Sequence, residues 1–221
     1  RDKRTCLSYL LILLYAVLQS AFHPSPPKQV SPYDIYQNLF SSPAITFLLI
    51  PLFLLLIEHN AVLFDHSCVI LRMGQRGTWW KSRILCLGMD IGIFIAVTNG
   101  LVLLFSFLSE QPGRSFSILR MILLNGVLQF FGYAFLGVLF ITGKVLTGKT
   151  FIGFIAAYAV ITLDYLFLQL GINLSILSRS MFLPADGGLW LAHFLYLLFM
   201  FGVVTAGSYY LVKDMDFLQT D

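Results

Sequence analysis

Six long apolar runs separated by short polar segments limit what this chain can fold into. Each run is close to the roughly 20 residues that an α-helix needs to cross the hydrocarbon core of a bilayer. None alternates apolar and polar residues as the strands of an outer-membrane barrel do, so helices are the structure that satisfies the backbone in lipid. The predicted spans are Cys6–Phe22, Pro43–Phe64, Ile84–Leu108, Ile118–Thr142, Phe151–Gly171 and Leu189–Val212.

The composition agrees with a membrane protein and excludes other classes. Of the 221 residues, 58% are hydrophobic and 11% are charged, whereas a typical soluble domain has about 25% charged residues. A soluble fold of this size cannot bury so many apolar side chains, which excludes an ordinary cytosolic enzyme, a disordered chain and a disulfide scaffold. The net charge of +3 is too small to indicate nucleic-acid binding. We therefore predict an all-α, polytopic membrane protein in which residues 1–221 form one transmembrane domain.

The positions of the basic residues predict the orientation. With six spans, ten of the 14 Lys and Arg residues fall on one side of the membrane and four on the other. Because short cytoplasmic loops are enriched in Lys and Arg, both termini are predicted to be cytoplasmic. Cys6, Cys68 and Cys86 then lie at or near the reducing face, where free thiols are expected. The run Leu7–Phe22 lacks a small-x-small cleavage site, so we expect it to be retained as the first helix.

The segment 65–83, between the second and third spans, carries the most distinctive motif. Three of its basic residues are spaced by four and seven, so on a helix they share a face, and two adjacent tryptophans precede the third span. Two glycines permit a bend between short amphipathic pieces. These residues are Arg72, Arg76, Arg83, Trp79, Trp80, Gly74 and Gly77. Such residues are ordinary interface anchors; the alternative is a short helix across the cytoplasmic face that docks into a partner's groove.

The pattern Arg-x-x-x-Arg-x-x-Trp-Trp-x-x-(Arg/Lys) in this position resembles bacterial ABC-transporter permease subunits of the type-2 exporter class. The resemblance is greatest to the short permeases that export antimicrobial peptides or confer immunity to them. The topology match covers the whole chain, while the motif covers one short segment. The matching residues are Ile70, Arg72, Arg76, Trp79 and Trp80, and Gly74-Gln75 stand where the family commonly has Gly/Lys-Ser.

The resemblance implies a permease of the bacterial cytoplasmic membrane that exports an amphipathic or peptide substrate. It would pair with a second permease subunit and with a cytoplasmic ATP-binding-cassette ATPase that holds ATP and Mg²⁺. This chain would then have no catalytic site and no cofactor of its own. The residues implied to couple the ATPase to the permease are Arg72, Arg76, Trp79, Trp80, Lys81 and Arg83.

The run Gly143–Thr150 matches the phosphate-loop pattern G-x-x-x-x-G-K-[ST], and Asp164 follows an apolar stretch like one that positions a magnesium-binding aspartate. A true phosphate loop follows a strand of a parallel sheet. Here both flanks are apolar runs of membrane length, and no further segments remain to build a nucleotide-binding core. We interpret the motif as a cytoplasmic turn whose lysines follow the positive-inside rule, and which offers a second, smaller contact to an ATPase.

Polar residues inside the spans are costly in lipid, so each is a candidate for function. Asp90 lies in the third predicted span and Asp164 in the middle of the fifth, while Asn125 and Gln129 share one face of the fourth. We name these four as candidates for a translocation path. The alternative is that they form hydrogen bonds between neighbouring helices.

Two pairs of small residues predict close helix packing: Gly88 with Gly92, and Gly202 with Ala206. The sequence contains no zinc-protease or serine-hydrolase motif, and the spacing of its histidines makes a metal site unlikely to form. Two alternatives to a permease stay open. One is a non-transporting membrane protein for immunity or assembly, and the other is an intramembrane enzyme built around Asp164 and Asp90.

Overall fold

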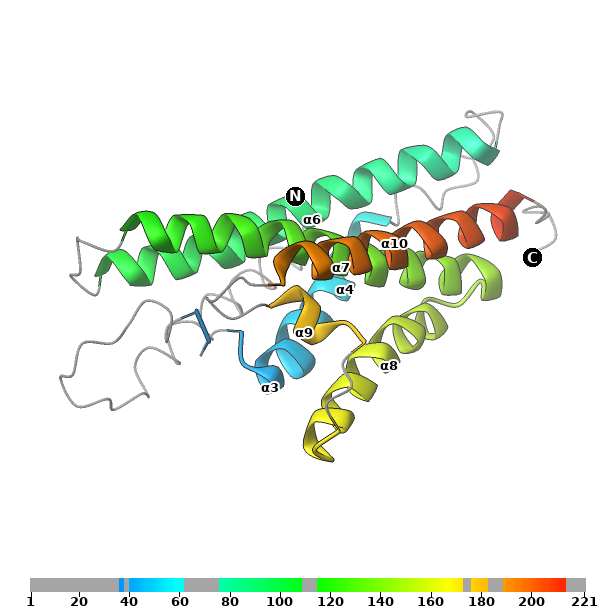
Figure 1. The fold of residues 1–221 in the computed structure, drawn as a ribbon. Coiled ribbons are helices and arrows are strands. Elements are labelled where there is room, and N and C mark those ends of the chain that lie inside the picture. Colours follow the sequence, from blue (N-terminus) through cyan, green and yellow to red (C-terminus); the bar gives the residue numbers. More distant parts are fainter. Residues whose placement is uncertain are drawn as a thin grey trace.

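All regular structure in the described part of the chain is helical. The computed structural model describes residues 36–37, 40–61, 76–108, 115–172, 176–182 and 189–213. Its elements are α3 (Ser42–Ala44), the π-helix η1 (Ile45–Leu49), α4 (Ile50–Ala61), α6 (Arg76–Leu108), α7 (Ser115–Thr147), α8 (Thr150–Gln169), α9 (Ser178–Met181) and α10 (Trp190–Lys213). Figure 1 shows α6, α7 and α10 as long, roughly aligned helices, from which α8 diverges.

Five segments of the described residues are long and apolar enough to cross a membrane. They are Ser42–Asn60, Gly77–Leu104, Leu119–Thr147, Thr150–Gln169 and Trp190–Lys213. This confirms an all-helical chain with several membrane-length helices. The sixth predicted span, Cys6–Phe22, lies outside the described residues, and the cytoplasmic location of the termini stays a prediction.

The third span begins earlier than the sequence predicts. We expected a span from Ile84, and one of our two interpretations placed a separate short helix before it, but α6 runs without interruption from Arg76 to Leu108. Gly77 therefore lies within the first turn of α6 and not at a bend between two helices. The cause is tertiary packing: Trp79 and Trp80 are each only 2% exposed, so the helix that carries them is stabilised by the bundle and not by its sequence periodicity.

A proline explains the irregular second span. Pro51 lies in α4 and has no N–H to donate to the carbonyl four residues earlier, at Phe47. Directly before α4, the backbone widens into the π-helix Ile45–Leu49. Such widened turns accommodate backbone groups that a proline has left without their usual helical partner, which matters most where water is absent. The predicted span Pro43–Phe64 agrees with this segment as far as Ala61, where the described part ends.

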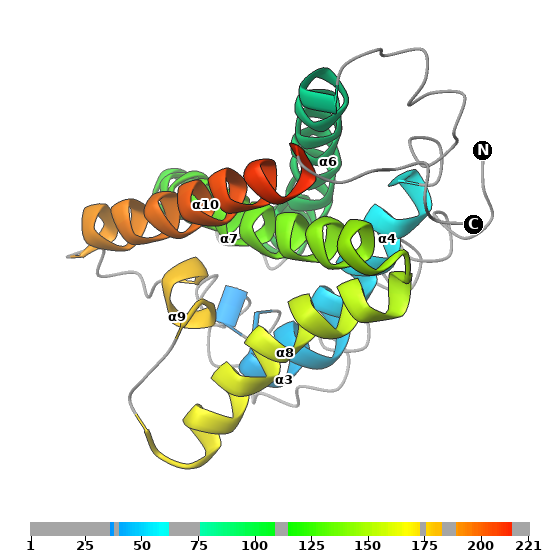
Figure 2. The same cartoon turned by 90° about the vertical axis from the view of Figure 1, so that its right-hand side faces the viewer.

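α7 is the central helix of the bundle and packs against α6, α8 and α10. Of the residues in its most apolar stretch, 61% are buried, compared with 22% for α8 and 17% for α10. Figure 2 shows α8 leaning away from α10, with α9 near the gap between them. The two outer helices therefore present most of their apolar surface to whatever surrounds this chain, as helices in lipid do.

α7 and α8 approach each other closely at Gly143 and Gly153. A Cβ atom added to Gly143 would lie 2.9 Å from the Cα atom of Gly153. The predicted motif pairs behave differently: among the described residues, nothing lies within 4 Å of a Cβ added to Gly92 or to Gly202. The prediction of close contacts at those two glycines is wrong for this part of the chain, because both face outward from the bundle.

Six basic residues of the described part of the chain lie at one end of the bundle, whereas Arg120 near the start of α7 and Arg179 in α9 do not. The start of α6, the α7–α8 turn and the end of α10 lie together in Figure 1. They carry Arg76, Lys81, Arg83, Lys144, Lys149 and Lys213. This arrangement is the one that the positive-inside rule associates with the cytoplasmic face.

Candidate functional site

A chain of buried hydrogen bonds links three elements inside the bundle. The Asn99 side chain in α6 donates from Nδ2 to Oε1 of Gln129 in α7 at 3.0 Å. Gln129 in turn donates from Nε2 to the hydroxyl oxygen of Tyr36 at 3.1 Å. Gln129 is fully buried, and Asn99 and Tyr36 are 5% and 2% exposed. We call these three residues the amide relay.

The amide relay agrees with the helix-bonding interpretation of Gln129. Hydrogen bonds between helices compete with no water in a bilayer, although their net contribution is modest. Asn125, predicted to act with Gln129 on the same face of α7, is also buried at 3% exposure. A role for either residue in a translocation path stays a prediction.

We expect the Gln129–Tyr36 hydrogen bond to show a measurable coupling energy. A double-mutant cycle with Gln129→Leu and Tyr36→Phe should give a coupling of about 0.6 kcal/mol, the average for hydrogen bonds between membrane helices, and at most about 1.7 kcal/mol. The measurement is reversible unfolding in detergent. Tyr133→Phe is the matched control, because the buried Tyr133 hydroxyl has no hydrogen-bond partner among the described residues. A cycle of Gln129→Leu with Tyr133→Phe should give no coupling, and equal couplings in both cycles would contradict the relay.

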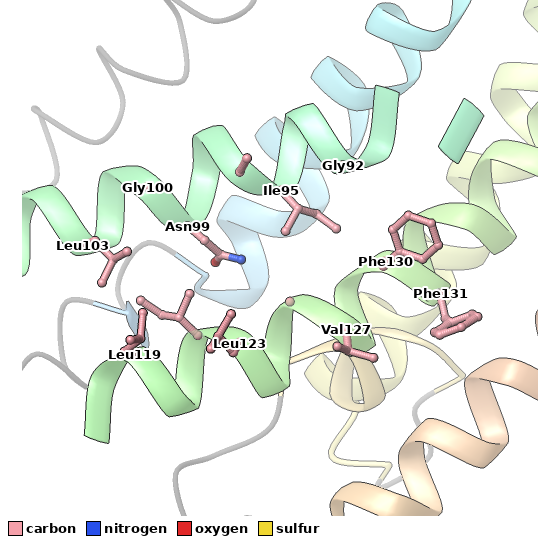
Figure 3. Close-up of a pocket in the computed structure, with 13 residues that line it drawn as sticks. Gly92, Ile95, Asn99, Gly100, Leu103, Leu119, Leu123, Val127, Phe130 and Phe131 are labelled. Carbon is pink, nitrogen blue, oxygen red and sulfur yellow. The ribbon is translucent and has the colours of Figure 1, made fainter. Parts of the chain in front are cut away.

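Beside the amide relay, α6 and α7 enclose an apolar cleft of about 520 Å³ (Figure 3). Its mouth is formed by outward-facing residues of both helices, including Gly92, Ala96, Leu119, Leu123 and Val127. Figure 3 shows the Asn99 side chain extending from α6 toward α7. Among the described residues that line this cleft, Asn99 has the one polar side chain, and the others are apolar residues or glycine.

Asp164 holds the segment around α9. Its carboxyl oxygens accept hydrogen bonds from the backbone N–H groups of Leu177 and Ser178, both at 2.7 Å, and of Ile176. The side chain is 2% exposed. These donors lie at the start of α9, where backbone N–H groups lack helical partners and where an acidic group is favourable. The carboxyl group thus joins α8 to a segment at least 12 residues further along the chain.

Further contacts fix α9 between the long helices. The Tyr196 hydroxyl of α10 donates to the Ile176 carbonyl oxygen at 2.8 Å. Ser180 and His193 of α10 share a hydrogen bond of 3.1 Å. The fully buried Met181 lies against Gly132 of α7, where a Cβ atom would overlap its side chain. The hydrogen bonds of Asp164 therefore anchor this segment, and a role for Asp164 in a path stays a prediction.

Asp90, the fourth candidate for a translocation path, forms a hydrogen bond with α4. Its Oδ1 accepts a hydrogen bond from Asn60 Nδ2 of α4 at 2.8 Å, and its side chain is half-buried. Asp90, Gln129 and Asp164 thus bond to different partners, and these bonds do not bring the candidates into one site. None of the described hydrogen bonds joins Asp90 to Asp164, the two residues around which an intramembrane enzyme was the alternative.

Of the four predicted coupling residues whose side chains the structure describes, three lie inside the bundle. Trp79, Trp80 and Arg83 are each 2% exposed, and the Arg83 guanidinium lies 5.2 Å from the Trp79 ring centroid, within range of a cation–π contact. Lys81, on the other side of the helix, is exposed. Arg72 lies outside the described residues, and of Arg76 the structure describes the backbone.

The phosphate-loop-like run forms a turn between two helices. Gly143–Thr147 is the last part of α7, and α8 begins at Thr150. Gly148 has φ +65°, a conformation that glycine adopts readily where a helix ends. The Thr147 hydroxyl donates to the Gly143 carbonyl oxygen at 2.7 Å. A phosphate loop requires a strand before it, and here the preceding element is a helix, as we predicted.

Metal-ligating residues do not cluster within the described ranges: no group of three or more His, Cys, Asp and Glu side chains there could hold an ion. Cys86 is a free thiol. His66, Cys6 and Cys68 lie outside the residues that the structure describes.

Sequence reasoning missed Asn99 and Tyr36. A strongly polar side chain inside a predicted span was the available signal for Asn99, since such residues are rare in lipid. No sequence signal connects Tyr36 with Gln129, because the bond joins residues 93 positions apart.

Comparison with known proteins identifies no relative: no family model, no curated protein and no solved structure matches this chain.

Proposed function

We propose that this chain is the transmembrane permease subunit of an ATP-driven exporter of the bacterial cytoplasmic membrane. It moves an amphipathic or peptide substrate out of the cell, while a separate cytoplasmic ATPase binds ATP and Mg²⁺. A second permease subunit, identical or different, completes the path. The proposal starts from the resemblance of residues 65–83 to type-2 exporter permeases, and the five membrane-length helices support it.

The observation that carries the proposal is that the coupling residues continue directly into a spanning helix. Trp79, Trp80 and Arg83 lie in the first turns of α6 and are buried. At about 1.5 Å per residue, 33 residues of helix measure about 50 Å and exceed the roughly 30 Å hydrocarbon core. A force applied at the start of α6 therefore acts on a helix that is already packed into the bundle, as a permease driven from the cytoplasm requires.

Exposed and buried coupling residues have different roles in this proposal. Lys81 is available to an ATPase, whereas the buried tryptophans transmit movement into the bundle. Tyr209 of α10 lies against the start of α6, since a Cβ added to Gly77 would meet its hydroxyl at 3.5 Å. Movement at the coupling segment thus reaches α10 as well as α6.

Co-purification tests the proposal. The tagged full chain is extracted in mild detergent from membranes of the source cells, and the soluble ATPase that comes with it is measured. We expect the double variant Arg72→Glu/Lys81→Glu to lose bound ATPase by about tenfold or more, the scale of a charged hot spot. Lys213→Glu is the matched control, because it reverses one exposed charge at the same end of the bundle. ATPase bound equally by the double variant, or absent from the unmodified chain, would refute the proposal.

Burial of the tryptophans also favours a second candidate, a non-transporting membrane protein for immunity or assembly. Side chains with 2% exposure serve packing within the chain. In that case the chain confers immunity or supports assembly without any bound ATPase. The variant Arg72→Glu/Lys81→Glu then retains this activity in full in cells.

A further inference from the structure

We propose that the face of α4 and α6 around Asp90 is the contact site for a second copy of this chain. In the dimer, Asn60 of each copy donates a hydrogen bond to Asp90 of the other. The inference names the second subunit of the exporter, and in that respect it rests on the proposed function. Dimer formation itself is measured without an ATPase and without transport.

Asp90 is an ionisable residue in the middle of a membrane-length segment. It lies 13 residues after Gly77 and 14 residues before Leu104, the two ends of the apolar segment of α6. Its side chain is half-buried, so part of it reaches the surface of the chain. Acidic residues inside spans are costly, and they almost always face protein or a water-filled cavity and pair with a polar group. This face of α6 is therefore unsuited to contact with lipid alone.

The hydrogen bond between Asn60 and Asp90 leaves other polar groups of both side chains unused. Asn60 Nδ2 donates to Oδ1 of Asp90 at 2.8 Å. Among the described residues, neither the second carboxyl oxygen of Asp90 nor the amide oxygen of Asn60 has a hydrogen-bond partner. Neither oxygen belongs to the unpaired polar atoms that are sealed inside the described part of the chain. Both can therefore be reached from outside.

The unused groups of the two side chains are complementary to each other. The Asn60 amide has a second N–H donor, and Asp90 has a second acceptor oxygen. Contacts across a twofold axis are reciprocal, so Asn60 of each copy can donate to Asp90 of the other. Hydrogen bonds of this kind join helices in membranes. A second copy of the chain thus supplies the missing partners, which a lipid tail cannot do.

The surface of α6 around Asp90 is apolar and open. Met89 and Ile93 are each 54% exposed. Cys86 precedes Asp90 by four residues, so it lies beside Asp90 on the same face of the helix, and it is a free thiol. A second copy docked at Asp90 would cover these side chains together with the carboxyl group. It would also place the two Cys86 thiols of the dimer close to the twofold axis.

Cross-linking of the full chain in membranes with a short bis-maleimide tests this contact. Cys6 and Cys68 are replaced by serine, so that Cys86 is the one remaining thiol. The control is Val203→Cys in a chain whose three native cysteines are all replaced. Cys86 lies ten residues after the start of α6 and Val203 ten residues before the end of α10, and these two ends lie together (Figure 1). We expect Cys86 to give about tenfold more cross-linked dimer than the control, although Val203 is 53% exposed.

Substitutions at Asn60 and Asp90 test the hydrogen bonds. We expect Asp90→Leu and Asn60→Leu each to weaken dimerisation in detergent about tenfold, because either change removes both reciprocal bonds. Asp90→Asn should retain the dimer, since the amide keeps an acceptor oxygen at this position. The cross-linking experiment uses a chain in which both residues are intact, so it stays valid if a leucine variant does not fold.

Three results would overturn the proposal. The first is equal cross-linking at Cys86 and at the Val203→Cys control, which would mean that copies meet only by random collision. The second is a product in which Cys86 is joined to a different protein, which would mean that the second subunit is not a copy of this chain. The third is unchanged dimerisation in both leucine variants. A chain that dimerises in this way but binds no ATPase would refute the exporter proposal and leave the present one intact.

Discussion

Gly153→Ala is expected to destabilise the protein, although alanine is the better helix former. A Cβ atom at this position would overlap the carbonyl oxygen of Phe140 and lie 2.9 Å from the amide nitrogen of Lys144. Both obstacles are backbone atoms of α7, which cannot rotate away as a side chain can. Helix propensity favours alanine by about 1 kcal/mol, whereas overpacking costs about 1–3 kcal/mol or more. We expect a net loss of about 2 kcal/mol, because α7 and α8 must separate.

Thermal unfolding in detergent measures this effect. For a chain of this length, about 2 kcal/mol corresponds to a fall in Tm of about 4–8 °C. Gly202→Ala is the matched control, since nothing among the described residues lies within 4 Å of a Cβ at that helical glycine, and its Tm should stay equal or rise. If Gly202→Ala lowers the Tm while Gly153→Ala does not, the α7–α8 contact is wrong.

Asp164→Ala is expected to release the segment around α9. It removes the acceptor for three backbone N–H groups, and each buried donor left without a partner costs about 1–3 kcal/mol. We therefore expect a loss of about 3 kcal/mol or more in the free energy of unfolding. Asp164→Asn retains one acceptor oxygen and should fall between the alanine variant and the unmodified protein.

Cysteine labelling distinguishes release of α9 from general unfolding. Met181 is fully buried, so Met181→Cys, in a chain whose three native cysteines are replaced by serine, should react slowly with a water-soluble maleimide. Adding Asp164→Ala should raise this rate about tenfold or more, since each 1.4 kcal/mol of opening free energy is a factor of ten. Asp90→Ala is the control, because it removes one hydrogen bond to Asn60 and should leave the rate unchanged. An equal increase in both variants would show that α9 does not depend on Asp164.

The helices themselves were predictable because the requirement they satisfy is local. Every backbone N–H and C=O group in lipid must be bonded within the segment, so an apolar run such as Phe151–Gly171 predicts a helix almost independently of its neighbours. The observed α8, Thr150–Gln169, differs at its end by two residues, where Gly171 at φ +70° terminates the helix. The start of α6 was not predictable in this way, because burial of Trp79 and Trp80 extends it.

The candidate site was predicted only in part. Polar residues inside the spans could be recognised as unusual, and this identified Gln129 and Asp164. Their partners could not be recognised: Asp164 bonds to backbone amides that any residue could supply, and Gln129 bonds to Asn99 and Tyr36 from two other segments. Small-residue spacing likewise indicated Gly92 and Gly202, while the contact formed at Gly143 and Gly153.

By itself, the sequence determined that this chain forms apolar helices of membrane length. It also determined that the Lys and Arg residues that flank these helices are divided unequally between the two sides. Both properties follow from the transfer of each segment into lipid, which depends on that segment alone. The tertiary structure decided which faces of the helices meet, that Asp164 anchors α9, and that Asn99 of α6 bonds to Gln129 of α7. In lipid, apolar faces do not drive helices together by hydrophobicity, so close packing and the geometry of individual hydrogen bonds select the arrangement.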